Sequence, residues 1–149
     1  MKNFGNESDL REVLERVWRL DSRAQRRWGA MNVHPMVCHM ADALRMILGD
    51  KPVQSRQTWV GRHVMRHAAL RLPVQWPHGF PTTPEANQEI GGTVPVEFER
   101  DRVAAADLIR RFARTREFAA HPMFGPMSRW EWMRWGYLHT DHHLRQFGG

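Results

Sequence analysis

Two histidines one helical turn apart, His139 and His143, are the residues whose types and spacing most directly indicate chemistry. They lie in the segment 128–147, which opens with Ser128 and Glu131 in the S-x-x-E pattern of a helical capping box. On a helix, the H-x-x-x-H spacing places both imidazoles on one face, where they can reach the same ion. The predicted face is otherwise apolar and aromatic and consists of Trp132, Trp135, Gly136, His139, His143, Gln146 and Phe147. The pattern predicts metal ligation, with a pair of hydrogen-bonded core histidines as the alternative.

A third imidazole, that of His39, lies on an earlier predicted helix and can converge with the pair if the long connections cross the bundle. Three neutral imidazoles leave positions open for water or substrate and suit Zn²⁺, Ni²⁺ or Fe²⁺. Taken alone, one histidine on a helix flank more often satisfies a local carbonyl. Gln146 is predicted to hold a bound water or a ligand imidazole from outside the ligand set. His142 is adjacent to the inward face and has either the same role or a contact with Asp141 or solvent.

Other reactive side chains are predicted to have different roles. His63 and His67 repeat the H-x-x-x-H spacing, but the arginines around them disfavour a cation. Cys38 should face away from the site, because one position on a helix rotates a side chain by about 100°. Asp101 is predicted to be a helix N-cap, with a general base as the less favoured role. His121 belongs to a turn that we expect to be structural and more than about 15 Å from the metal site.

The periodicity of apolar residues predicts four amphipathic helices and no strand pair, hence an all-α four-helix bundle with long crossover connections. The helices are predicted at about 7–21, from Asn32 to the glycine stop at Gly49, from Asp101 to about Phe118, and from Ser128 to Gly148. A shorter helical segment is predicted at about 58–72. Residues 73–95, rich in proline and glycine, are predicted to be a loop that serves as a lid or a packing strap.

Composition limits the function classes. A chain of 149 residues suits one domain, 1–149, that can bury a core without needing a metal to fold. The net charge of +6 is spread over helix faces rather than gathered in a run, which argues against nucleic acid and leaves attraction of an anionic small molecule as the next possibility. No signal peptide and no membrane span are recognised, and the single cysteine excludes an internal disulfide, so a cytoplasmic protein is expected.

The ending H-T-D-H-H-L-R-Q-F at 139–147, the segment W-G-A-M-N at 28–32 followed by His39, and the turn H-P-M-F-G at 121–125 resemble the DinB/YfiT-like metalloenzyme superfamily, and most of all a branch of unknown function. The resemblance spans nearly the whole chain. It implies a four-helix bundle in which His39, His139 and His143 bind a divalent metal. Members with assigned activities include S-transferases and isomerases that use low-molecular-weight thiols such as bacillithiol or mycothiol, and they are often dimers.

Two functions of different classes follow from these observations. The first is a metal-dependent enzyme, a transferase or hydrolase, in which the ion polarises a small substrate or activates a bound water or thiol. The second is a non-catalytic metal-binding module whose surface mediates homodimerisation.

Overall fold

The computed structural model describes residues 1–73, 75–79 and 82–148. In these ranges the elements are α1 (Glu7–Arg19), α2 (Val33–Ile47), the π-helical turn η1 (Gly61–Met65), α3 (Arg66–Arg71), the 3₁₀ turn η2 (Pro84–Ala86), α4 (Phe98–Arg114) and α5 (Arg129–Gln146). The described part of the chain contains no strand beyond one isolated bridge between His121 and Gly125. The all-α prediction is therefore confirmed. Parts of the predicted 73–95 loop, at 74 and 80–81, and the last residue of the predicted domain lie outside the described residues.

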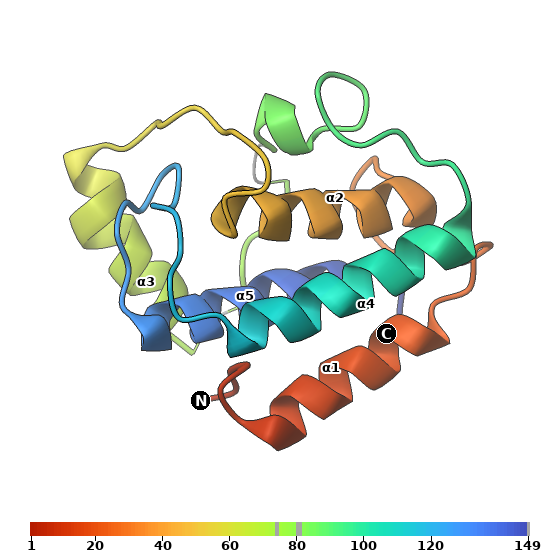
Figure 1. Cartoon of the computed structure of the whole chain (residues 1–149), viewed down its shortest axis with the longest axis horizontal. Helices are drawn as coiled ribbons and strands as arrows, with labels where there is room; N and C mark the ends of the chain where they lie inside the picture. Colours follow the sequence, from red (N-terminus) through yellow and green to blue (C-terminus); the bar gives the residue numbers. More distant parts are fainter. Residues whose placement is uncertain (74, 80–81, 149) are drawn as a thin grey trace.

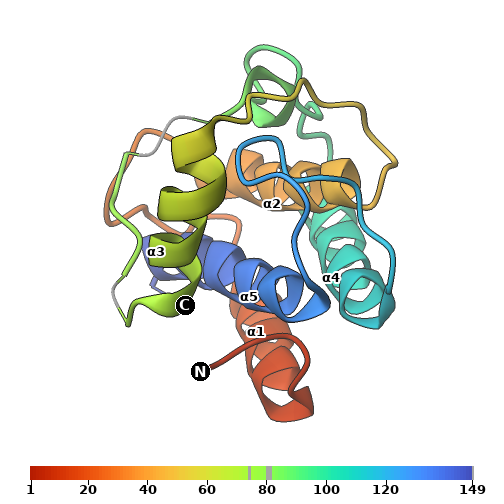
Figure 2. The same cartoon turned by 90° about the vertical axis from the view of Figure 1, so that its left-hand side faces the viewer.

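The four long helices enclose one core. Helices α4 and α5 lie next to each other, with α2 on one side of the pair and α1 on the other (Figure 1). Helix α3 packs against α5, as the turned view shows (Figure 2). The buried core includes Val13 and Val17 of α1, Met36 and Leu44 of α2, and a group of aromatic rings around Phe112 and Trp132. Because α2 and α5 pack against each other, a side chain from each can meet between them.

Local signals fixed the start of the last helix as predicted. The Ser128 hydroxyl accepts from the backbone N–H of Glu131, while the Glu131 carboxylate accepts from the backbone N–H of Ser128. This reciprocal capping box satisfies donors that the first turn of any helix leaves unpaired. At the other end Gly148 adopts a positive φ of 85°, the backbone conformation expected of a glycine stop.

The predicted start of α4 was wrong. The helix begins at Phe98, and Glu97 is its N-cap, because the Glu97 carboxylate accepts from the backbone N–H groups of Glu99 and Arg100. Asp101 lies inside the first turn and accepts instead from the backbone N–H of Val96 and from groups on α2. Glutamate is a less common cap than aspartate, so the local pattern favoured the wrong carboxylate.

Among the described residues, no helix is both long enough and apolar enough to cross a membrane.

Candidate metal centre

Three imidazoles meet between α2 and α5. His39 comes from α2, and His139 and His143 come from successive turns of α5. The ring centroids are 4.6 Å apart for His39 and His143, 4.8 Å for His139 and His143, and 5.3 Å for His39 and His139. One nitrogen from each ring lies within 4.8 Å of one nitrogen from each of the others. These residues, called here the three-histidine group, are arranged as the sequence predicted and could hold one metal ion.

The His39 ring is buried and oriented by a carbonyl. Its exposed fraction is 6%, and its Nδ1 lies 2.9 Å from the carbonyl oxygen of Ala86 in η2. A carbonyl only accepts hydrogen bonds, so Nδ1 carries the proton and Nε2 is left with a free lone pair. This is the tautomer that a metal ligand requires, and a carbonyl behind the ring is a common means of fixing it.

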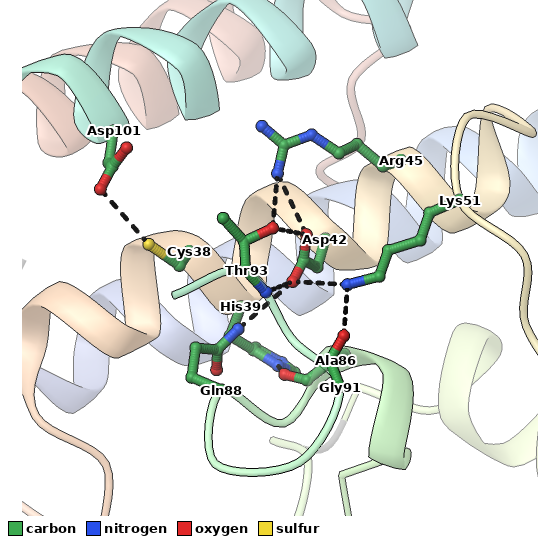
Figure 3. Close-up of polar contacts among 10 residues, drawn as sticks. All are labelled: Cys38, His39, Asp42, Arg45, Lys51, Ala86, Gln88, Gly91, Thr93 and Asp101. Atoms are coloured by element: carbon green, nitrogen blue, oxygen red, sulfur yellow. Dashed lines mark hydrogen bonds and ion pairs between the residues drawn. The ribbon is translucent and has the colours of Figure 1, made fainter. Parts of the chain in front are cut away.

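The segment that supplies this carbonyl is fastened to α2 by Asp42, whose side chain is completely buried (Figure 3). Its carboxylate accepts from Thr93 through both the backbone N–H, at 2.6 Å, and the hydroxyl, at 2.7 Å. Lys51 donates to Asp42 at 3.0 Å and to the Gly91 carbonyl at 2.9 Å. Residues 86–93 therefore form a strap across α2, in agreement with one of the two roles predicted for the loop.

Asp42 was missed by sequence analysis, although a carboxylate within an apolar helical stripe is itself a signal. Burial alone would raise its pKa, but the hydrogen bonds from Thr93 and Lys51 outweigh burial and lower the pKa below the ordinary aspartate value. Arg45 adds a further donor at 3.0 Å. The carboxylate thus stays charged at neutral pH and its acceptor sites are occupied.

Gln146 orients His143 and connects it to the loop before α2. The Gln146 Oε1 atom lies 3.3 Å from Nδ1 of His143, and its Nε2 donates to the carbonyl of Trp28 at 2.9 Å. That second bond settles which end of the amide faces the histidine, so Nδ1 of His143 is the donor and Nε2 is free. Gly29 has a positive φ of 77°, and a Cβ there would lie 2.7 Å from Gln146 Nε2. Gln146 therefore contacts the imidazole of His143, one of the three predicted metal ligands.

The electrostatic environment keeps the three-histidine group neutral. Burial lowers the pKa of His39, and it lowers the pKa of His139 and His143 well below the usual histidine value. Repulsion between the imidazoles adds to this effect at His139 and His143. The His139 ring stacks on Trp135 at 4.9 Å, and within the described part of the chain its buried Nδ1 has no hydrogen-bond partner. Neutral rings with free nitrogens are the donor set that a divalent transition metal binds.

Aromatic side chains border the group where it approaches solvent. His139 and His143 are half-buried, and the His142 ring lies 5.2 Å from that of His143. Trp28, Trp76 and His78 lie around His142, and the rings of Trp28 and His78 stack at 4.2 Å. These four side chains are called here the aromatic rim, of which only His142 was predicted to lie near the site. A cleft of about 310 Å³ shares Trp76 with the rim and is also lined by Leu138 and Arg145.

Asp141 is engaged away from the three-histidine group. It accepts from Arg16 of α1 at 2.7 Å and from Arg145 at 2.9 Å, so the alternative pairing of His142 with Asp141 is not formed. The helix face predicted from the sequence thus separates the histidines from the salt-bridged side of α5.

Two other histidine predictions have different outcomes. His63 and His67 are exposed on η1 and α3 and join no candidate ligand cluster among the described residues. His121 was placed too far away. Its ring and that of His139 both contact Trp135, at 5.5 and 4.9 Å, so their separation cannot exceed the sum of these distances. The turn folds back over the first turns of α5, and the estimate failed because it treated the span as extended along the helix axis.

The His121 side chain nevertheless holds its own turn together. Its Nδ1 accepts from the backbone N–H groups of Met123 and Phe124, both at 3.1 Å. Burial lowers the pKa of His121 to about 3, so the ring is neutral at physiological pH. These contacts agree with a structural role for the turn.

Cys38 faces away from the three-histidine group, as its helical position predicted. Its thiol donates to the Asp101 carboxylate across 3.6 Å, and His34 Nε2 lies 2.8 Å from the same oxygen. Burial and then the Asp101 and Asp42 carboxylates raise the pKa of the Cys38 thiol to about 12. Cys38 is therefore not an activated nucleophile.

Comparison with known protein families gives one match, which extends over nearly the whole chain. Residues 8–148 match the family described as "Protein of unknown function (DUF1569)". The chain belongs to the DUF1569 family. No curated protein and no solved structure gives a significant match. The matched residues thus include α2, η2 and α5, the elements that carry and orient the three-histidine group. The family description names no reaction.

Proposed function

We propose that the three-histidine group of this DUF1569 protein binds one divalent ion, Zn²⁺, Ni²⁺ or Fe²⁺, and that the ion serves a reaction on a small molecule. The observation that carries the proposal is the fixed tautomer of two of the rings. Ala86 and Gln146 occupy Nδ1 of His39 and His143, which leaves Nε2 of both rings free. One nitrogen from each of the three rings lies within 4.8 Å of one nitrogen from each of the others. Histidines that only stabilise a core would form hydrogen bonds with their neighbours, whereas here lone pairs of three rings converge without such partners among the described residues, as metal ligation requires.

The chain's own residues define what the site can do. Three protein ligands leave coordination positions open, and the half-buried His139 and His143 lie on the accessible side. A bound ion would polarise a substrate carbonyl or lower the pKa of a bound water or thiol. Trp28 and Trp76 border that side and limit the access of bulk water to it.

The reaction class that we propose is transfer to or from a low-molecular-weight thiol, with hydrolysis as the related alternative. This step rests on the likeness to DinB/YfiT-like metalloenzymes in the tail motif and in His39. The net charge of +6 favours an anionic substrate. A homodimer is a further expectation from the same resemblance, to be checked by light scattering.

Metal content tests the first part. Parent and His139→Ala proteins are purified without an affinity tag and analysed by plasma mass spectrometry. The variant should contain one ion per chain less than the parent. The double variant His63→Ala/His67→Ala is a matched control, because it removes an H-x-x-x-H pair from the surface and should leave the metal content unchanged. The melting temperature of metal-free His139→Ala should stay close to that of the metal-free parent, since the core does not need an ion to fold. Equal metal content in parent and His139→Ala protein would refute the site.

Turnover tests the second part. Metal-loaded protein is incubated with a panel of thiols and electrophilic acceptors, and thiol loss is followed with and without a chelator. Metal-dependent loss that disappears in His139→Ala supports the enzyme. A bound ion with no exchangeable water, measured by water proton relaxation on the Co²⁺-substituted protein, would instead favour a non-catalytic metal-binding module.

A further inference from the structure

A second cluster of metal-ligating side chains lies on the other side of α2. His34 and Cys38 are one helical turn apart on α2, and Asp101 faces them from the first turn of α4. The three ligand atoms, an imidazole nitrogen, a thiol sulfur and a carboxylate oxygen, all lie within 4.8 Å of one another. The cluster shares no residue with the three-histidine group.

We propose that His34, Cys38 and Asp101 form a second divalent-cation site, selective for Zn²⁺-like ions. The donor set argues for this class of ion, because thiolate and imidazole are ligands of Zn²⁺, whereas Mg²⁺ and Ca²⁺ take oxygen ligands. Two anionic ligands and one neutral imidazole also balance the charge of a dication. The proposal does not depend on the function proposed above.

The packing positions the ligands in advance. The His34 ring packs edge-on against Phe98 at 5.5 Å, and the Asp101 carboxylate also accepts from the backbone N–H of Val96 at 3.2 Å. Helices α2 and α4 pack along each other, so the two elements that carry the ligands are held together by the core. Little ordering remains to be done when an ion binds.

One side of the cluster is open to solvent. Cys38 is buried, while the side chains of His34 and Asp101 are 25% and 13% exposed. An ion can therefore enter past His34 and keep a water as its fourth ligand, the arrangement of a three-ligand zinc site. The sulfur also lies 3.6 Å from the Asp101 carboxylate, whose negative charge favours a cation beside it (Figure 3).

Cobalt spectroscopy separates the two sites, because Cys38 is the chain's single cysteine. Titration of metal-free, untagged protein with Co²⁺ should produce a sulfur-to-cobalt charge-transfer absorption in the near ultraviolet that reaches its plateau by two equivalents, one for each of the two proposed sites. His34→Gln, Cys38→Ser and Asp101→Asn should each lose the band, and His139→Ala should keep it. Circular dichroism of each variant establishes that it is folded.

Three results would overturn the second site. The first is a parent protein that shows no sulfur band, and the second is a band that persists in both His34→Gln and Asp101→Asn. The third is loss of the band in His139→Ala, which would place the sulfur on the ion of the three-histidine group. X-ray absorption of the Co²⁺-loaded parent protein needs no variant and should show sulfur in the cobalt coordination sphere; its absence overturns the proposal equally. Loss of metal by His139→Ala without loss of the sulfur band would support both sites separately.

Discussion

Removing the Asp42 carboxylate should destabilise the protein far more than removing an exposed carboxylate of similar sequence context. Asp42 is completely buried, and both its oxygens accept hydrogen bonds from Thr93, with Arg45 and Lys51 as charged donors. Breaking a buried charge pair costs about 3–5 kcal/mol. Because Arg45 and Lys51 are 30% and 20% exposed and regain water when Asp42 is removed, we expect the low end, about 3 kcal/mol, for Asp42→Ala.

Urea unfolding of the metal-free protein at pH 7, followed by circular dichroism, measures this difference. Asp107→Ala is the matched control, because Asp107 pairs with Arg110 at the same i,i+3 spacing but is 66% exposed. Its unfolding free energy should match that of the parent, as expected for a surface ion pair. A loss below about 1 kcal/mol in Asp42→Ala would refute the reasoning, since the network would then contribute no more than a surface ion pair.

The same variant tests whether the strap orients His39. Asp42 holds Thr93 and the strap, and the strap supplies the Ala86 carbonyl behind the His39 ring. Loss of a partner behind a ligand typically weakens metal affinity by about 10–100-fold. We expect Asp42→Ala, and not Asp107→Ala, to weaken binding by at least about tenfold in a competition titration. Unchanged affinity in a destabilised but folded variant would show that His39 is held without the strap.

Three further predictions concern single residues. The pKa of His121 is about 3 in the folded protein and ordinary in the unfolded chain, so the free energy of unfolding is highest above about pH 6.5 and falls by about 2 kcal/mol at pH 5. His121→Asn keeps an acceptor for the turn but cannot take up this proton. In urea unfolding at pH 7 and pH 5, it should therefore lose about 2 kcal/mol less than the parent protein between the two pH values. Gly29→Ala should cost more than Gly49→Ala in thermal unfolding, because both have positive φ but only at position 29 does a Cβ meet Gln146; equal costs would show that the contact relaxes freely. Ser128→Ala should cost about 1 kcal/mol in urea unfolding through loss of the cap, and a cost near zero would mean that the box does not stabilise α5.

The local patterns of the sequence were sufficient wherever the partners are near one another in the chain. Ser128 and Glu131 are three residues apart, and the helix itself brings them together. The H-x-x-x-H spacing of His139 and His143 likewise needs only a helical backbone to place both rings on one face. The convergence of His39 with them came from the bundle topology and from the resemblance, and the packing of α2 on α5 makes it possible.

Local patterns failed where a side chain's partner comes from a distant segment. Asp101 has the type of a cap residue, yet its carboxylate meets His34, which is 67 residues earlier in the chain, and Glu97 caps the helix instead. Asp42 and Thr93 are 51 residues apart. Neither contact leaves a periodic signal in the sequence.

The sequence by itself determined the helices, the capping of α5 and which histidines share its inner face, because backbone geometry over three or four residues fixes those relations. Only the tertiary structure decided the hydrogen-bond partner of each imidazole, the burial of Asp42 beneath the strap, and the meeting of His34, Cys38 and Asp101 across α2 and α4. The physical reason is that hydrogen bonds and ligand distances must be right to a few tenths of an ångström. That accuracy comes from the packing of whole helices and loops against one another.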